Sequence, residues 1–180
     1  AATGEKQLRN YVSQMIQTND PATIRFPVVA YYSTSRFSAN TSAQIPYTQQ
    51  KVEWFEGYRN ALDVKINFNQ LVLQMASFED LQRRERERLQ SFDYNSIALM
   101  AVKQVLVIML PDITNLRTKI DKQIILIADF NDGKTTKTLN ISQLSAGYQA
   151  LLAVVLDITF RLIILNREHS DCLEGEGIVM

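Results

Sequence analysis

Apolar residues recur at the three- and four-residue spacing of a helix in several stretches of this chain. Between residues 6 and 17, for example, Leu8, Tyr11 and Met15 fall on one face. Pro111 ends another such stretch, because a proline cannot donate the next helical hydrogen bond. The predicted helices, in chain order, are residues 6–17, 52–59, 67–90, 94–110 and 145–165.

Other stretches are rich in β-branched and aromatic residues, which favour strands. These are residues 26–33, 123–130 and 177–180, the last of which is predicted to begin a buried strand. The sequence Asn-Asp-Gly at 131–133 is typical of a hairpin turn, so residues 137–141 are expected to return as an antiparallel partner. Residues 34–50, rich in Ser, Thr, Asn and Gln, are predicted to form a loop. The pattern therefore predicts an α+β fold that is mainly helical.

The last predicted helix is apolar on nearly every side, which is typical of a helix inside a domain. Asp157 and Arg161 interrupt it four residues apart, a spacing at which they can form an ion pair. Its first turn, beginning after Ser145, carries no acidic residue to balance the positive end of the helix. A bound phosphate would supply that charge, and Gly147 would let it approach the backbone. The alternative is a core helix that Ser145 simply caps.

Composition narrows the class of protein. The chain has 180 residues, 46% of them hydrophobic and 21% charged, which is enough for one ordinary globular domain. Lys plus Arg equals Asp plus Glu at 19 each, so no overall charge attracts the protein to nucleic acid or anionic lipid. The apolar stretch 151–165 is cut by two charges and is too short to span a bilayer. With one cysteine and no apolar leader, the expected location is the cytoplasm, away from membranes.

Residues 78–90 form the most charged stretch, and acids and arginines alternate along it. Glu79 with Arg83, and Asp80 with Arg84, have the favourable spacing for ion pairs along a helix. Mixed charge of this kind is typical of a solvated helix face. The alternative is an arm that touches nucleic acid or a partner protein through its arginines, Arg83, Arg84, Arg86 and Arg88.

The segment LSAGYQALLAVVLDITFRL, residues 144–162, resembles the signature motif of ABC-type ATPases of the RecF/SMC-related class. It is more closely similar to predicted ATP-binding proteins of retron and other anti-phage systems. Their pattern L-S-x-G-Y-x-x-L-L-x-x-x-x-D-I-x-x-R matches Leu144, Ser145, Gly147, Tyr148, Leu151, Leu152, Asp157, Ile158 and Arg161. The blocks FPVVAYYSTSRF, FEGYRNALD and GIVM resemble further parts of that group, so the likeness spans nearly the whole chain.

This resemblance implies the helical lobe of an ABC-type ATPase head with a few strands. Residues 1–180 would form one domain, with a strand and helical insertion in 1–122 and a hairpin, signature helix and Walker B strand start in 123–180. In such ATPases the signature serine and glycine contact the γ-phosphate of ATP bound by a partner subunit. The implied ligands are ATP and Mg²⁺, the implied assembly is a homodimer of heads, and the implied contact residues are Leu144, Ser145, Ala146, Gly147, Tyr148 and Gln149.

Two catalytic elements of such ATPases do not occur in this sequence. No G-x-x-x-x-G-K-[ST] loop is found, and GKTT at 133–136 lacks the first glycine and falls in the predicted hairpin turn. The sequence ends at Met180, before any Walker B Asp-Glu. We therefore expect the interior of a larger ATPase, inactive alone. The alternative function is a non-catalytic module that binds nucleic acid or a protein through its charged helix.

No metal site is predicted. His169 lies near Asp171 and Cys172, but this spacing is more typical of an ordinary loop histidine than of a metal ligand.

Overall fold

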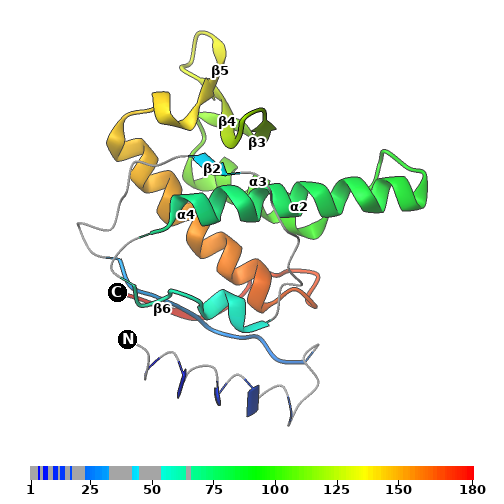
Figure 1. Cartoon of the computed structure of the whole chain (residues 1–180), viewed down its shortest axis with the longest axis vertical. Helices are drawn as coiled ribbons and strands as arrows, with labels where there is room; N and C mark the ends of the chain where they lie inside the picture. The colour runs from blue at the N-terminus through cyan, green and yellow to red at the C-terminus, as the bar shows by residue number, and fades with distance from the viewer. Residues whose placement is uncertain are drawn as a thin grey trace.

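The computed structural model describes residues 23–32, 42–44, 54–63 and 66–180, together with scattered helical positions between residues 4 and 17. Helices and strands are both well represented, so the α+β class is confirmed (Figure 1). The elements in chain order are β1 (Val28–Ala30), β2 (Ser42–Gln44), the 3-10 helix η1 (Trp54–Tyr58), α2 (Phe68–Leu89), α3 (Ile97–Met109), β3 (Ile113–Ile120), β4 (Gln123–Asn131), β5 (Thr136–Asn140), the 3-10 helix η2 (Ile141–Gln143), α4 (Ala146–Leu165) and β6 (Gly177–Val179).

The three long helices begin where side chains can cap them. Asn67, Ser96 and Ser145 each accept a hydrogen bond from a backbone N–H in the first turn of α2, α3 and α4. Such caps replace bonds that the first turn of a helix cannot make internally. The three predictions for these helices are confirmed to within a few residues. The predicted helix at 52–59 is the shorter η1.

The larger sheet is built around β4. Antiparallel β3 pairs along one edge of β4, and β2 and β5 pair with successive parts of its other edge. The predicted antiparallel return after the turn at Asn131 is confirmed, because Asn131 pairs with Thr136 at its start. Strand β3 was not predicted, and β2 lies inside the segment predicted as a loop, most of which falls outside the described residues.

A short parallel pair, β1 with β6, forms the second sheet. The strand predicted at 26–33 is therefore reduced to Val28–Ala30. The prediction that residues 177–180 begin a buried strand is wrong, because β6 is exposed along its length. Among the described residues, β1 is the one strand beside it, and side chains such as Ile178 remain open to solvent.

Helix α4 runs through the middle of the molecule and packs against α2, α3, η1 and β1 (Figure 1). Phe160 of α4 meets Phe78 of α2 edge to face, with ring centroids 5.4 Å apart. Near the other end, η1 approaches α4 so closely that a Cβ on Gly57 would lie 2.5 Å from Leu165 Cγ. Only glycine fits there. These contacts explain why α4 is apolar on nearly every side.

Helix α4 begins earlier than the apolar stretch that was predicted to be too short to cross a bilayer. Its 20 residues are long and apolar enough for a membrane span, judged by length and composition alone. Most of this apolar length is buried inside the fold, which is the arrangement of a core helix. Burial, rather than length, therefore distinguishes α4 from a membrane helix.

The predicted ion pair inside α4 is confirmed. Arg161 Nε lies 3.0 Å from Asp157 Oδ2, and both side chains are largely buried. Arg161 Nη1 also donates to the carbonyl oxygens of Gly57, at 2.8 Å, and Arg59, at 3.0 Å. Tyr32 Oη donates to Asp157 Oδ2 at 2.6 Å. The pair therefore ties α4 to η1 and to the segment after β1.

Asn166, at the end of α4, makes a second buried connection. Its Oδ1 accepts from Phe26 N at 2.8 Å and its Nδ2 donates to Phe26 O at 3.3 Å. This amide pairs with the backbone of the chain entering β1 as a neighbouring strand would. The C-terminal half of α4 is therefore fixed by polar as well as apolar contacts.

Replacing Arg161 with methionine should destabilise the fold strongly, because Asp157 would stay buried without its cation. We expect a loss of about 3 kcal/mol in the free energy of unfolding, measured by urea titration. Arg84→Met is the matched control, since Arg84 is over half exposed in its pair with Asp80. Its loss should stay below about 1 kcal/mol. Equal losses in the two variants would contradict the role given to Arg161.

Asp129 of β4 joins three strands of the larger sheet. Its carboxylate accepts from Arg117 Nη1 and Thr138 Oγ1, each at 2.6 Å, and from Asn115 Nδ2 at 3.1 Å. These donors, Arg117 first, hold the pKa of Asp129 well below its usual range. Because the folded pKa is lowered, the carboxylate stabilises the fold above the unfolded pKa of about 3.9.

The stability advantage of the native protein over Asp129→Asn should therefore persist at pH 7 and pH 5. This advantage should shrink as the pH falls below about 4, because the unfolded chain then binds a proton at Asp129 that the folded protein does not bind, whereas asparagine does not titrate. Urea unfolding of both proteins between pH 2 and pH 7 measures this difference in the free energy of unfolding. Asp121→Asn, in the exposed turn after β3, controls for the change in net charge. An Asp129 advantage that is constant across this range would refute the assignment.

Candidate functional site

The chain enters α4 through a tightly bonded turn. In η2, Asn140 Oδ1 accepts from Ser142 N at 2.9 Å, and Asn140 N donates to Gln143 Oε1 at 2.7 Å. This is a capping box, and the fully buried Ile141 anchors it to the core. Both bonds fix the direction from which the chain reaches Ser145.

Ser145 caps α4, as predicted. Its Oγ accepts from Tyr148 N at 3.3 Å, and its carbonyl accepts from Gln149 N at 2.9 Å. The backbone N–H groups of Ala146 and Gly147 bond to none of the described residues, and both residues are exposed. Two unpaired donors at the positive end of a helix are suited to an anion.

Gly147 is not explained by packing within the chain. A Cβ built on it would have no neighbour within 4 Å, and its backbone is not in the left-handed region. A glycine in a helix gives up about 0.5–1 kcal/mol relative to alanine. The open space above it leaves room for a group from outside the chain to approach the backbone.

The side chains of the next two residues turn inward. Tyr148 packs edge to face on Phe130 of β4, with centroids 5.6 Å apart, and its Oη lies 3.5 Å from Asp112 Oδ2. Burial, and then the Asp112 carboxylate, raises the pKa of Tyr148. Gln149 is buried, and its Nε2 donates to Leu144 O at 2.7 Å and Ser142 O at 3.3 Å.

The predicted contact residues therefore separate into two groups. Ser145, Ala146 and Gly147 present donors at the surface, whereas Leu144, Tyr148 and Gln149 hold the helix terminus against the sheet and η2. Successive residues of a helix are rotated by about 100°, which explains why the two groups point in different directions. Gln149 lies on the same buried face of α4 as Leu152 and Ala153, three and four residues later. A ligand contact for the side chain of Gln149 has no support in this geometry.

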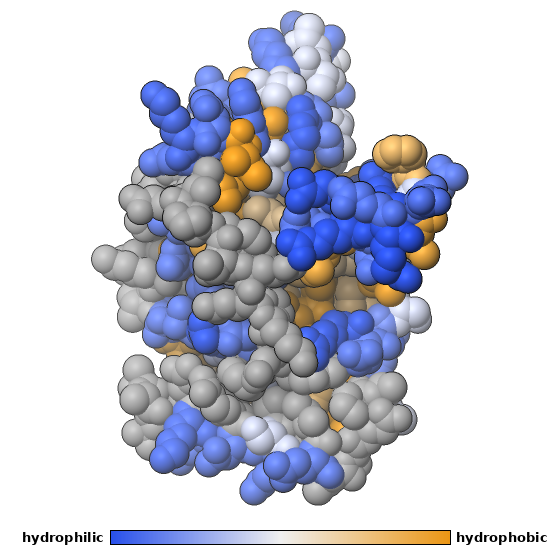
Figure 2. Space-filling model, turned by 45° about the vertical axis from the view of Figure 1, so that its right-hand side comes forward, coloured by the Kyte–Doolittle hydropathy of each residue, from blue (hydrophilic) through white to orange (hydrophobic). Residues whose placement is uncertain are grey.

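The arginines of α2 are largely compensated by their own helix. Arg83 and Arg84 both pair with Asp80, and Arg88 pairs with Glu85. Arg86 Nε donates to Tyr94 O at 2.7 Å, which ties α2 to the turn before α3. Figure 2 shows this outer half of α2 as a hydrophilic surface, with apolar side chains at its borders. A solvated face is the simpler description of these residues.

The predicted pair between Glu79 and Arg83 is wrong. Glu79 turns toward the sheet instead, where its Oε1 and Oε2 accept from Thr118 N at 3.0 and 3.2 Å. Burial raises its pKa, and the bonds from Thr118 act in the opposite direction. Glu79 directly precedes Asp80 in the sequence but faces the sheet, whereas Asp80 pairs with arginines on the outer face of α2, so charge spacing alone did not reveal this bond.

The remaining candidates from the sequence are structural. GKTT occupies the turn between β4 and β5, where Asp132 Oδ1 accepts from the backbone of Lys134 and Thr135. It does not connect a strand to a helix, as a phosphate-binding loop does. His169 Nε2 lies 2.8 Å from Ile24 O, a contact that fixes the loop after α4.

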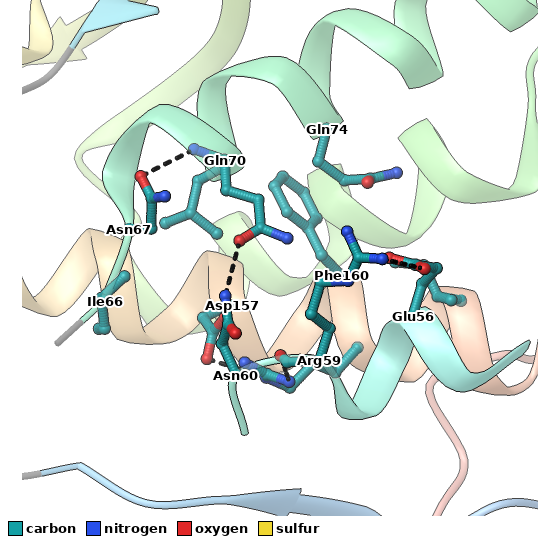
Figure 3. Close-up of a pocket in the computed structure, with 12 residues that line it drawn as sticks. Glu56, Arg59, Asn60, Ile66, Asn67, Gln70, Gln74, Asp157 and Phe160 are labelled. Carbon is teal, nitrogen blue, oxygen red and sulfur yellow. Dashed lines mark hydrogen bonds and ion pairs between the residues drawn. The ribbon is translucent and has the colours of Figure 1, made fainter. Parts of the chain in front are cut away.

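A polar hollow of about 50 Å³ lies between η1, α2 and α4 and was not predicted (Figure 3). Asn60, Gln70 and Gln74 line it together with Asp157 and Arg161. The Nε2 atom of Gln74 is buried and has no partner among the described residues. One or two water molecules, at about 30 Å³ each, would fill a space of this size. Helical spacing alone does not distinguish Gln74 from the other polar residues of α2.

Similarity to curated proteins adds a second line of information. A stretch of 96 residues, 53% of this chain, is 34% identical to the Escherichia coli protein named Retron Ec83 probable ATPase and covers 17% of it. An alignment of 202 positions is 24% identical to the Vibrio cholerae serotype O1 biovar El Tor protein named Retron Vc95 probable ATPase. It covers 89% of this chain and 39% of that protein. No family model matches the chain.

The chain is thus distantly related to probable ATPases of retrons and spans well under half the length of these relatives. The resemblance seen in the sequence is confirmed at this coarse level. The signature-motif assignment of residues 144–149 stays a prediction.

Gln74→Leu tests the unpaired amide. A buried donor without a partner costs about 1–3 kcal/mol, so leucine should leave the free energy of unfolding unchanged or raise it by about 1 kcal/mol. Gln149→Leu is the matched control, because its amide donates to two carbonyl oxygens, and it should lose about 1–3 kcal/mol. Urea titration of both variants measures the difference. A larger loss for Gln74→Leu than for Gln149→Leu would show that the hollow holds an ordered partner.

Proposed function

We propose that this chain is the signature-bearing lobe of an ABC-type ATPase that acts as an ATP-driven switch in anti-phage defence. In this proposal, the N-terminus of α4 contacts the γ-phosphate of ATP bound by a partner subunit in a head-to-head homodimer. Segments outside this sequence would bind most of the nucleotide and its Mg²⁺. The chain by itself would not hydrolyse ATP.

The observation that carries the proposal is the open N-terminus of α4. Ala146 and Gly147 present unpaired N–H groups at an exposed surface. Because Ser145 Oγ is an acceptor from Tyr148 N, its hydroxyl hydrogen remains available for donation to an oxygen of the ligand. Three donors on consecutive residues at one exposed helix end suit a phosphoryl group with several oxygens.

Rigidity behind the donors also supports the proposal. Transition-state charge is best stabilised by donors that need no rearrangement when the charge develops. Tyr148 and Gln149 hold the first turn of α4 in place, and the Asp157–Arg161 pair fixes its middle. Ser145 and the two amides would therefore stabilise charge on the transferred phosphoryl group, which is how proteins catalyse this type of reaction.

The relatives support the same class of function. Both are named as probable ATPases of retrons, and the chain covers only part of each. This partial coverage fits a chain that would supply the signature segment while other segments supply the phosphate-binding loop. The alternative, a module that binds nucleic acid through Arg83, Arg84, Arg86 and Arg88, is less favoured because three of these four arginines are paired with carboxylates of α2.

Gly147→Asp in the full-length protein separates folding from function. A carboxylate in the first turn of a helix stabilises it by about 0.3–1 kcal/mol, and a side chain at this position meets no neighbour. The same charge would repel an approaching phosphate. We therefore expect an unchanged or higher melting temperature, ATP hydrolysis reduced by at least about tenfold, and ATP binding by the monomer intact.

Two further variants complete this experiment. Ser145→Arg should also abolish hydrolysis and spare ATP binding, because it blocks the same surface with a large side chain. Thr136→Asp places a carboxylate on the exposed β4–β5 hairpin and should leave turnover unchanged. Normal hydrolysis by Gly147→Asp and Ser145→Arg would refute the proposal.

A further inference from the structure

A second and larger hollow opens between α2, α3 and β3, and we name it the α3–β3 cleft. Its volume is about 820 Å³, within the range of sites that bind ligands. The lining includes Met75 and Glu79 of α2, and Leu116 of β3. Helix α3 contributes most of the remaining wall.

The wall formed by α3 is apolar and open to solvent. Met100, Val107 and Ile108 line the cleft, and they are 57%, 60% and 69% exposed. Folded monomers seldom leave apolar side chains of this size clustered at a hollow, and such clusters commonly mark interaction sites. None of the described residues covers these three side chains.

The floor of the cleft includes the free edge of a strand. Strand β3 pairs with β4 along one side, and no described strand pairs with the other. Residues Ile113–Arg117 of β3 line the cleft. A strand edge is a row of backbone donors and acceptors that can pair with another extended segment.

The hydrogen bonds of Glu79 show which backbone groups of β3 point away from β4. Its carboxylate accepts from Thr118 N, as a carbonyl oxygen of a neighbouring strand would. Because alternate residues of a strand direct N–H and C=O to the same side, those of Leu116 also point away from β4. Among the described residues, none bonds to the backbone of Leu116 from that side.

The charges at the cleft are unequal. Lys103 is exposed on the lining and has no ion pair among the residues that the structure describes. Arg117 also lines the cleft, but it is bound by Asp129. The carboxylate of Glu79 is only partly exposed and is turned toward Thr118 of β3. The exposed charged group of the lining that has no described ion pair is therefore the ammonium group of Lys103.

We propose that the α3–β3 cleft binds an extended acidic peptide segment of a partner protein, which adds to the free edge of β3 as a further strand. Leu116 exchanges backbone hydrogen bonds with it, alternate apolar side chains pack on Met100, Val107 and Ile108, and a carboxylate faces Lys103. Strand addition to an exposed edge is an established way to bind peptides. A helical partner would leave the backbone of Leu116 unpaired.

The edge also limits the length of this strand. Thr118 N is occupied by Glu79, and Ile113 N donates to Leu110 O at 2.9 Å. The available edge therefore lies between these residues. At about 3.3 Å per residue, it accommodates a segment of about three to five residues.

Selection of random heptapeptides displayed on phage against the 180-residue chain tests this proposal. We expect enriched sequences with apolar residues at every second position and at least one Asp or Glu. A peptide made from the enriched sequence should bind, and N-methylation of the amides that face β3 should weaken binding at least about tenfold. Failure to enrich any peptide, enrichment at helical spacing, or indifference to N-methylation would each overturn the proposal.

Variants of the chain locate the peptide. Val107→Asp should weaken binding at least about tenfold, whereas Met109→Asp, on the same helix but outside the cleft lining, should not. Lys103→Glu should weaken binding of the acidic peptide and favour a version in which its acid is replaced by lysine. These side chains are exposed, so the variants should fold. Equal binding by all three would show that the peptide lies elsewhere.

Discussion

Burial of α4, with an ion pair inside it, is the constraint on which the rest of this fold depends. Placing two charges in a protein interior carries a large desolvation penalty unless further hydrogen bonds satisfy them. Arg161 meets this requirement through Asp157 and two backbone carbonyl oxygens of η1. The same bonds attach η1, which also packs on α4 through Gly57 and Leu165. Because the middle and end of α4 are fixed in this way, its first turn can remain exposed without loss of order.

The long helices were predictable because local and tertiary signals agree in them. Caps such as Ser145 stand next to strongly apolar runs, and packing against the core strengthens the same choice. Strand β3 was missed for a physical reason. The register shift between Ile113 and Asn115 breaks the alternation of buried and exposed residues from which a strand is recognised. The parallel pair of β1 and β6 depends on contacts between distant residues, which no local pattern reveals.

The candidate site was predictable in part. Features that depend on residue type and order could be predicted, whereas the directions of individual side chains could not. The serine cap and the open backbone after it depend on residue type and order, which the sequence shows directly. The inward turn of Gln149 depends on which face of α4 meets η2, and the contact of Glu79 with β3 depends on how α2 crosses the sheet. Alternation of charge on α2 predicted its solvated face correctly, with Asp80 and Glu85 as acceptors, but it could not assign each partner.

The proposed phosphate contact and the proposed peptide cleft share one structural element, the β3–β4 hairpin. Tyr148 rests on Phe130 of β4 beside the cap of α4, and the free edge of β3 forms the floor of the cleft. A strand added to β3 would lie about 10 Å from β4, two strand spacings away. Strands β3 and β4 pair along most of their length, and the Asp129 carboxylate of β4 accepts hydrogen bonds from Arg117 and Asn115 of β3. The two proposed sites therefore rest on neighbouring strands of one hairpin, with Asp129 bonded between them.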